Sequence, residues 1–333
     1  MKLILKKAFT GNILTSAEAE YVMEIILSGK ASVEEISGFL GALHSRGEHV
    51  QELLGFLNAL RKKAVRLPTE STDLMDTCGT GGDGAHTFNI STVCALVVAS
   101  LGVKIAKHGN RSVSSKCGSA DVLEALGVPT QLSPERAAES IDALGFAFLF
   151  APKFHPALAV VAPVRKALGV RTVFNLLGPL ANPARVTRQV IGVPDPSFMD
   201  KFAEVLKESG SIEAMIVSAE DGLDEFSISS NNRVVHLKNG QITRYNLCPE
   251  DFGLPRSSLE HLKGGEAPEN AKIIELILGG EKGPRRDVVL MNSSAALVVA
   301  GIASSLKEGV RLAAHTIDSG QALGVLKELR RQQ

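Results

Sequence analysis

From about Pro68 onward, short apolar runs alternate along the sequence with longer stretches of helical periodicity. We expect the apolar runs to be strands, at residues 73–78, 103–107, 146–150, 188–193 and 214–218. The expected helices include residues 90–101, 119–126, 134–144 and 197–208. Such alternation is typical of an α/β fold with a mostly parallel central sheet and helices on its faces.

Two later stretches depart from this alternation. Residues 233–245 have the pattern of an antiparallel pair of strands, with Asn239 and Gly240 as the hairpin turn. Residues from about 268 to 331 return to helical periodicity. We therefore expect a hairpin followed by a helical segment.

The first 66 residues show only helical patterns. Ser32 and Glu35 form a capping box that opens one helix, and another helix is expected over residues 50–64. No strand pattern interrupts them. The sequence therefore predicts an α/β protein with a small all-helical N-terminal domain at residues 1–66 and a larger α/β domain at residues 70–333.

Composition disfavours several classes of partner. The chain has 36 basic and 36 acidic residues, whereas a general nucleic-acid binder usually shows a basic excess. Trp is absent and Tyr occurs only twice, so aromatic stacking platforms for single strands are also not expected. We expect no nucleic-acid partner.

The cysteines and the apolar runs bear on location. Cys78, Cys94, Cys117 and Cys248 form no C-x-x-C pair and no zinc pattern, which favours reduced thiols in a cytosolic protein. The apolar run at the N-terminus is too short for a signal peptide, and no run approaches the ~18 residues of a membrane span. We expect a soluble, cytoplasmic protein with no membrane partner.

A glycine-rich loop follows the first expected strand, with the sequence DTCGTGGDG. Gly79, Gly81 and Gly84 match G-x-G-x-x-G, but a dinucleotide-binding loop also needs an acidic residue at the end of the next strand. That strand instead ends in KHGNR, and no Lys completes a Walker A loop. These features disfavour a dehydrogenase and predict a different phosphate cradle, in which Asp83 could accept hydrogen bonds from sugar hydroxyls or bind a metal.

A helix start and a second polar loop extend this cradle. Asn89, Ser91 and Thr92 offer polar side chains at the N-terminus of the helix that follows the glycines. Residues 107–119 hold three cations, four serines and two glycines at the end of the next strand. Ligands bind at the carboxyl ends of strands in α/β sheets, so we expect both loops to face the same anionic ligand.

Two further stretches carry charged candidates. Asp224 and Glu225 are adjacent carboxylates, typical of a solvated turn but also able to hold Mg²⁺ beside substrate phosphates. Arg165 lies two residues past Pro163, which is expected to break a helix, and could pair with a substrate carboxylate. His155, among prolines, is more typical of a packed residue than of an acid or base.

Taken in chain order, these motifs resemble those of the anthranilate phosphoribosyltransferase family over essentially the whole length. The matching stretches are 79–83 (GTGGD), 89–92 (NIST), 107–112 (KHGNRS), 118–124 (GSADVLE), 171–175 (RTVFN) and 222–225 (GLDE). The first two loops are shared more broadly with nucleoside phosphorylases of the same fold. The Arg165 region and residues 175–183 resemble the anthranilate enzymes more narrowly.

The resemblance implies an active site in the cleft between the two domains, with a helical segment near 160–180 completing the helical domain. It implies a homodimer formed through the helical domain. It implies transfer of the 5-phosphoribosyl group from phosphoribosyl pyrophosphate (PRPP) to the amine of anthranilate, a step of tryptophan biosynthesis.

The resemblance also implies residue roles. PRPP would be bound by Gly79, Gly82, Asp83, Thr87, Asn89, Ile90, Ser91, Thr92, Lys107, His108, Gly109, Asn110, Arg111, Ser112, Val113, Ser114, Ser115 and Ser119. Mg²⁺, with two ions per active site, would be held by Ser91, Asp224 and Glu225. Anthranilate would contact Gly79, Asn110 and Arg165, with His108 and His155 lining its path.

The chemistry expected of such a site needs no strong general base. Departure of pyrophosphate leaves oxocarbenium character on the ribose, and an aromatic amine is already a neutral nucleophile at pH 7. Catalysis would rest on neutralising the leaving group and positioning the amine. The alternatives are a pyrimidine nucleoside phosphorylase of the same fold, which would need no paired carboxylates for metal, and a non-catalytic relative that binds nucleic acid.

One local departure from the family pattern stands near the expected anthranilate path. After His155-Pro156-Ala157 the family commonly has Met and then a larger polar or basic residue. This chain has Leu158 and Ala159. The departure concerns the entry channel and leaves the expected reaction unchanged.

Overall fold

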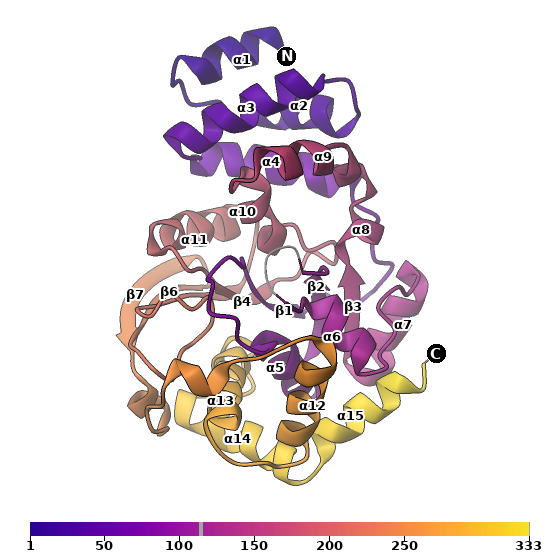
Figure 1. Ribbon diagram of the computed structural model, residues 1–333, viewed down its shortest axis with the longest axis vertical. Coiled ribbons are helices and arrows are strands. Elements are labelled where there is room, and N and C mark those ends of the chain that lie inside the picture. Colours follow the sequence, from indigo (N-terminus) through magenta and orange to yellow (C-terminus); the bar gives the residue numbers. More distant parts are fainter. Residues whose placement is uncertain (113–115, 333) are drawn as a thin grey trace.

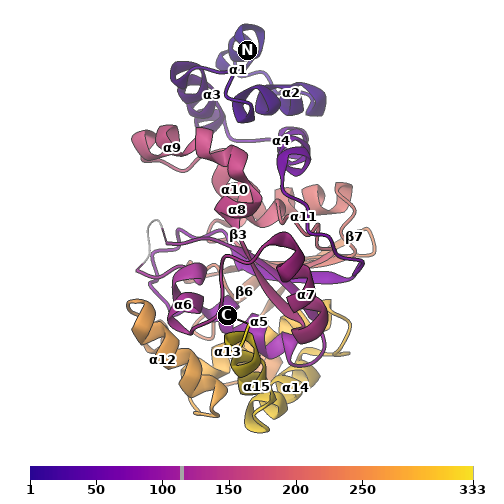
Figure 2. The same cartoon turned by 90° about the vertical axis from the view of Figure 1, so that its right-hand side faces the viewer.

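Figure 1 shows the computed structural model of the chain, in which residues 1–112 and 116–332 are described. A bundle of N-terminal helices lies at one end of the molecule, and a central sheet with helices on its faces forms the remainder (Figures 1 and 2). The architecture is the predicted one: a helical N-terminal part and a larger α/β part with a mostly parallel sheet.

The chain alternates between strands and helices after residue 70. The strands are β1 (Leu74–Gly79), β2 (Lys104–Gly109), β3 (Phe146–Phe150), β4 (Arg188–Gly192), β5 (Glu213–Ala219), β6 (Asn232–Lys238) and β7 (Gln241–Leu247). The helices up to β4 are α1 (Lys2–Phe9), α2 (Ser16–Leu27), α3 (Val33–Arg46), α4 (Val50–Lys63), α5 (Ile90–Ala99), α6 (Ser119–Ala125), α7 (Pro134–Leu144), α8 (Ala151–Phe154), α9 (Ala162–Leu168) and α10 (Val173–Leu180). Those after β4 are α11 (Met199–Glu208), α12 (Ala267–Leu278), α13 (Pro284–Val299), α14 (Leu306–Asp318) and α15 (Gln321–Arg330). Short 3-10 turns are η1 (Pro156–Val160), η2 (Pro196–Phe198), η3 (Pro249–Phe252) and η4 (Leu259–Leu262).

The sheet has the strand order β3-β2-β1-β4-β5-β6-β7. The strands β3, β2, β1, β4 and β5 run parallel, and β6 and β7 add antiparallel at one edge. The chain moves outward from β1 to β3 and then returns to place β4 on the other side of β1. This reversal between β1 and β4 is where open α/β sheets bind ligands, beyond the carboxyl ends of the strands.

Local signals in the sequence account for several element boundaries. Ser32 and Glu35 form both bonds of the capping box that opens α3. Asn239 and Gly240 have φ angles of 48° and 78°, the two positive values that a tight hairpin turn requires, so the predicted hairpin is confirmed. Pro163 lies in the first turn of α9, after η1, so the helix is broken there as predicted.

Both faces of the sheet are buried. On β5, Met215 and Val217 pack with α5 and α13, whereas Ala214 and Ile216 face α11 and the helical bundle. This alternation follows from the two-residue period of a strand. The bundle is therefore joined to the sheet by a continuous apolar core rather than by a flexible linker.

Helices α9 and α10 connect the two parts. Both contact α3, and α10 also contacts α4, so the segment near 160–180 lies against the N-terminal bundle. In Figures 1 and 2, α8 and α10 stand between the bundle and the sheet. No helix within the described residues is both long enough and apolar enough to cross a membrane.

Candidate active site

The carboxyl ends of β1 and β2 lie side by side and open into one cavity of about 520 Å³. Every described residue of the predicted PRPP set lines this cavity, together with Asp224 and Glu225 from the segment after β5. The two loops are therefore brought together as predicted. Val113, Ser114 and Ser115 lie outside the described residues.

The glycine loop after β1 uses its glycines in two ways. Gly81, Gly82 and Gly84 have φ angles of 73°, 83° and 67°, a region that side-chain-bearing residues rarely adopt. Gly79 makes room for a neighbour, since a Cβ there would lie 2.1 Å from Asp224 Oδ2. The close approach of Asp224, and not phosphate alone, therefore requires glycine at position 79.

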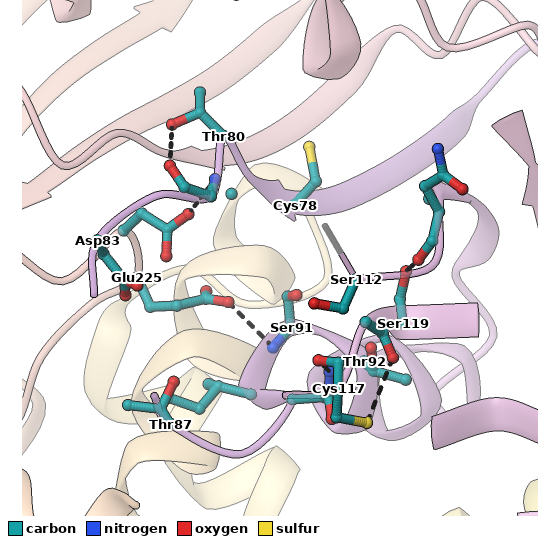
Figure 3. Close-up of a pocket in the computed structure, with 18 of the residues that line it drawn as sticks. Cys78, Thr80, Asp83, Thr87, Ser91, Thr92, Ser112, Cys117, Ser119 and Glu225 are labelled. Atoms are coloured by element: carbon teal, nitrogen blue, oxygen red, sulfur yellow. Dashed lines mark hydrogen bonds between the residues drawn. The ribbon is translucent and has the colours of Figure 1, made fainter. Parts of the chain in front are cut away.

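Asp224 and Glu225 connect the glycine loop to the start of α5 by accepting hydrogen bonds from backbone N–H groups of both. The Gly81 N–H donates to Asp224 Oδ2 at 2.7 Å, and the Ser91 N–H donates to Glu225 Oε1 at 3.1 Å. Figure 3 shows Glu225 extending to Ser91, with Asp83 on the same side of the cavity. The sequence separation of these contacts explains why no local pattern predicts them.

The surroundings of the two carboxyl groups disfavour their ionised forms. Burial raises the pKa of Asp224 well above its usual value, and repulsion from Glu225 and Asp83 raises it further. Burial likewise raises the pKa of Glu225, although Lys107 opposes the shift. Carboxyl groups with raised pKa values in the wall of a polar cavity are suited to a divalent cation.

The oxygen donors fit Mg²⁺ in particular. Among the residues the structure describes, no group of three or more His, Cys, Asp or Glu side chains is arranged as a metal site. Mg²⁺ usually takes only one or two protein carboxylates and fills its other positions with substrate phosphates and water. Asp224, Glu225 and the Ser91 hydroxyl therefore fit a cation that is completed by a bound phosphate group.

Lys107 points into the protein rather than only toward the cavity. Its ammonium donates to the Thr77 carbonyl at 2.6 Å and to Ser91 Oγ at 3.3 Å, and the side chain is almost fully buried. It opposes the rise in the pKa values of Glu225 and Asp76. Lys107 thus offsets negative charge beneath the cavity.

Arg111 is also paired within the protein. Its guanidinium bonds Asp121 at 3.0 Å and Glu124 at 2.7 Å. Asp121 in turn accepts the N–H groups of Ser112 at 3.0 Å and Gly118 at 2.9 Å. The sequence carries one signal for this role of Asp121, which stands three residues after Gly118, at the acidic position of a helix start.

A second cavity of about 240 Å³ adjoins the first. The two share Cys78, Gly79, Thr80, His108, Gly109, Asn110 and Asn175. The other walls are mostly apolar and come from α4, the α8–α9 segment and α10: Leu60, Ala151, His155, Leu158, Arg165, Phe174, Leu177, Gly178, Pro179 and Ala181. The second cavity therefore lies between the helical bundle and the sheet.

Arg165 is the charged group of this apolar cavity. Its guanidinium lies 5.6 Å from the centre of the Phe174 ring, and burial lowers its pKa from the usual value. Within the described chain it forms no ion pair or hydrogen bond. A half-buried cation without a carboxylate partner is suited to a carboxylate ligand.

His108 and His155 are packing groups held neutral. His108 Nδ1 lies 3.2 Å from the Gly178 carbonyl and His155 Nε2 lies 2.8 Å from the Ala181 carbonyl, so both rings donate to the end of α10. Burial lowers the pKa of His108 to about 3 and also lowers that of His155. Neither ring is cationic at pH 7, in line with the expected packed role of His155.

Of the two positions at which the sequence departs from the family pattern, Leu158 lines the second cavity. Ala159 is absent from its lining among the described residues. The departure therefore affects one wall of this cavity and not the shared wall where the cavities meet.

Asp76 lies on β1 behind the cavities and lines neither of them. This fully buried carboxylate accepts the Asn182 amide at 2.8 Å, and Asn182 also donates to the Ala106 carbonyl at 2.8 Å. The link joins β1 and β2 to the segment after α10. Burial raises the pKa of Asp76 to about 6, although Lys107 and Asn182 oppose the shift.

The raised pKa of Asp76 predicts a pH-dependent stability. The folded protein binds the proton of the Asp76 carboxyl more tightly than the unfolded chain does. Protonation of Asp76 therefore stabilises the fold at low pH, and this stabilisation is lost as pH rises through about 6. When the pH is lowered from 7 to 5, the free energy of unfolding should increase more in the wild type than in Asp76→Asn, by on the order of 1 kcal/mol. Urea unfolding at both pH values, without Mg²⁺, measures this difference. Equal gains in the two proteins would contradict the assignment.

The chain was compared with known families and proteins. Residues 71–323 match the glycosyl transferase family, a/b domain, and residues 2–64 match the glycosyl transferase family, helical bundle domain. An anthranilate phosphoribosyltransferase of Symbiobacterium thermophilum is 48% identical over 330 residues, which cover 99% of this chain and 97% of that protein.

Solved structures agree with the sequence relatives. The crystal structure of anthranilate phosphoribosyltransferase from Thermus thermophilus has a TM-score of 0.94 and 46% identity, covering 98% of both chains. The enzyme from Saccharomyces cerevisiae in complex with PRPP and Mg has a TM-score of 0.91 and 29% identity, covering 98% of this chain and 96% of that chain. The similarity therefore extends over both the helical and the α/β parts.

Proposed function

Since this chain belongs to the anthranilate phosphoribosyltransferase family, we propose that it transfers the 5-phosphoribosyl group of PRPP to the amine of anthranilate and releases pyrophosphate. It is thus a pentosyltransferase, and we assign it to tryptophan biosynthesis. The observation that carries the proposal is the pair of adjoining cavities. One has glycine loops and paired carboxylates, and the other is apolar with the unpaired Arg165.

The first cavity is assigned to the donor. N–H groups of the glycine loop, the Ser91 and Thr92 hydroxyls at the start of α5 and the Asn110 region supply hydrogen bonds to phosphate oxygens. Asp83 lines the same wall and is assigned to the ribose side. A relative solved with PRPP and Mg supports this assignment.

Ser91, Asp224 and Glu225 would hold the metal, which we propose to be two Mg²⁺ ions per site. When bound, Mg²⁺ offsets the negative charge of the departing pyrophosphate. The Gly81 and Ser91 N–H groups keep both carboxylates in place before substrate arrives. The positive charge of Lys107, which bonds Ser91, opposes the rise in the pKa of Glu225.

The second cavity is assigned to anthranilate. Arg165 would bind the carboxylate, the apolar walls would hold the ring, and the shared wall with Gly79 and Asn110 would place the amine beside C1 of the ribose. The neutral ring of His108 lies on this wall, and the neutral ring of His155 lines the second cavity alone, so neither adds charge beside the acceptor. The C1–oxygen bond breaks with its electron pair leaving on pyrophosphate as the amine nitrogen bonds C1, and the nitrogen then releases one proton to solvent.

This assignment is tested against the phosphorylase alternative by offering both sets of substrates. We expect pyrophosphate release with anthranilate, PRPP and Mg²⁺, and no base release from uridine or thymidine with inorganic phosphate. The paired carboxylates and Arg165 favour the transferase. Release of free base from a nucleoside would favour the phosphorylase instead.

We also propose a cytoplasmic homodimer formed through the helical bundle, with residues 1–66 as its helical domain. Large apolar side chains are exposed on the bundle, with Leu3, Phe9 and Val33 more than half exposed. Light scattering should give twice the chain mass of 35.3 kDa, and Leu3→Asp with Phe9→Asp should give the monomer mass. Monomeric wild-type protein at micromolar concentration would contradict this assignment.

A further inference from the structure

Asn175 lies at the wall that the two cavities share, and the reaction assigned above gives it no role. It lines both cavities, whereas Arg165 lines only the second one. It comes from α10, next to Phe174, on whose ring the Arg165 guanidinium lies. Asn175 therefore lines the acceptor cavity together with Arg165 and also lines the donor cavity.

The direction of the Asn175 amide is fixed by the start of α10. Its Oδ1 accepts the Thr172 N–H at 3.1 Å and the Thr172 hydroxyl at 3.5 Å, which closes the capping box of the helix. Because an N–H group can bond only the oxygen of the amide, the nitrogen must face the other way. Within the described chain, Nδ2 has no hydrogen-bond acceptor.

The neighbouring amide is arranged in a similar way. Asn110 Oδ1 accepts the Arg111 N–H at 2.8 Å, which leaves the nitrogen of Asn110 as the donor at the same wall. Two amide donors and the Arg165 guanidinium thus surround a cavity whose other walls are mostly apolar. This donor set is suited to an anion with two oxygens, such as a carboxylate.

The geometry of an ortho-amino acid makes the shared wall decisive. In anthranilate the carboxylate is adjacent to the amine, so an amine held at the shared wall brings a carboxylate oxygen there as well. In the meta and para isomers the carboxylate is farther from that wall. A donor at the shared wall can therefore distinguish the isomers better than the Arg165 guanidinium, which does not line that wall.

We propose that Asn175 donates a hydrogen bond from Nδ2 to the acceptor carboxylate and thereby selects aromatic amines with an ortho carboxylate. The proposal rests on the transferase function above and adds a specificity-determining residue to it. Asn175 acts on the acceptor and not on PRPP. The oxygen of its amide accepts the capping hydrogen bond at the start of α10, and the nitrogen donates to the substrate carboxylate.

The substitution Asn175→Asp separates these two tasks. One carboxylate oxygen can keep the capping bond from the Thr172 N–H, while the other replaces the donor with a negative charge facing the substrate carboxylate. The Michaelis constant for anthranilate should rise about 20-fold, since a charge-assisted hydrogen bond is lost. The inhibition constant of benzoate, which has the carboxylate but no amine, should rise by a similar factor. The Michaelis constant for PRPP should change less than about twofold.

Two further variants separate substrate contact from structure. Asn231→Asp makes the same chemical change on an exposed loop and should leave both Michaelis constants unchanged. Thr172→Val removes the hydroxyl of the cap but keeps the backbone N–H. It should lower the melting temperature without the rise in the constant for anthranilate.

Three outcomes would overturn the inference. One is a wild-type Michaelis constant for anthranilate in Asn175→Asp. Another is an equal rise for PRPP, which would assign the amide to the donor. The last is a Thr172→Val variant that reproduces the effect of Asn175→Asp, which would make the role structural. If the wild type converts anthranilate while any of these holds, the function stands and the inference alone fails; if the wild type does not convert anthranilate, both fall.

Discussion

Replacing Asp224 with Asn and Glu225 with Gln should lower turnover at least about 100-fold. The two amides can still accept the Gly81 and Ser91 N–H groups, so the loop and the start of α5 should keep their positions. What the variant loses is the negative charge that would hold Mg²⁺ beside the leaving pyrophosphate. The effect should therefore fall on catalysis rather than on folding.

The same double variant should be more stable than the wild type in the absence of Mg²⁺. Burial and mutual repulsion raise the pKa of Asp224, which means that its ionised form is costly in the folded protein. Neutral amides remove that cost, so the melting temperature should rise. Titration calorimetry of Mg²⁺ with PRPP, together with thermal melts, measures both effects.

The matched control is Glu250→Gln with Asp251→Asn. This adjacent acidic pair is exposed on η3 and receives the same change in charge. The control should keep wild-type turnover and Mg²⁺ dependence. An Asp224 and Glu225 double variant with unchanged Mg²⁺ dependence would contradict the metal assignment.

Replacing Arg165 with Ala should raise the Michaelis constant for anthranilate about 100-fold and leave that for PRPP nearly unchanged. Within the described chain the guanidinium has no ion pair, and it lines the apolar cavity but not the adjoining donor cavity. Removing it takes away the positive charge opposite the substrate carboxylate. Steady-state kinetics with each substrate varied in turn measures the two constants.

Arg244→Ala is the control for the loss of a positive charge. Arg244 is exposed on the edge strand β7 and pairs with Asp200 of α11. Both Michaelis constants should stay at wild-type values in this variant. An equal rise of the two constants in Arg165→Ala would place Arg165 in the donor site or in the fold.

Most of the architecture could be predicted from the sequence because its signals are local. The five parallel strands lie at or within two residues of the expected ranges, and α7 has the expected bounds. Glycines, prolines and capping boxes act over a few residues, so their consequences are readable without the fold. That the two loops line one cavity could be predicted because the carboxyl ends of neighbouring parallel strands meet at one edge of the sheet.

What could not be predicted are the partners that tertiary structure supplies. Gly81 and Asp224 are 143 positions apart, and only the folded sheet shows that Gly79 makes room for a carboxylate. Likewise, nothing local indicates that Arg111 pairs with Asp121 and Glu124. The two loops can be predicted from the sequence, but the charged side chains that pair with them cannot.

The most direct test of the account is the loss of anthranilate fluorescence when the protein is mixed with anthranilate, PRPP and Mg²⁺. The fluorescence should decrease only when all three components and the enzyme are present, with one pyrophosphate formed for each anthranilate consumed. Chelation of Mg²⁺ should stop the decrease. Stable fluorescence with the complete mixture and folded protein would show that this protein does not transfer the phosphoribosyl group to anthranilate.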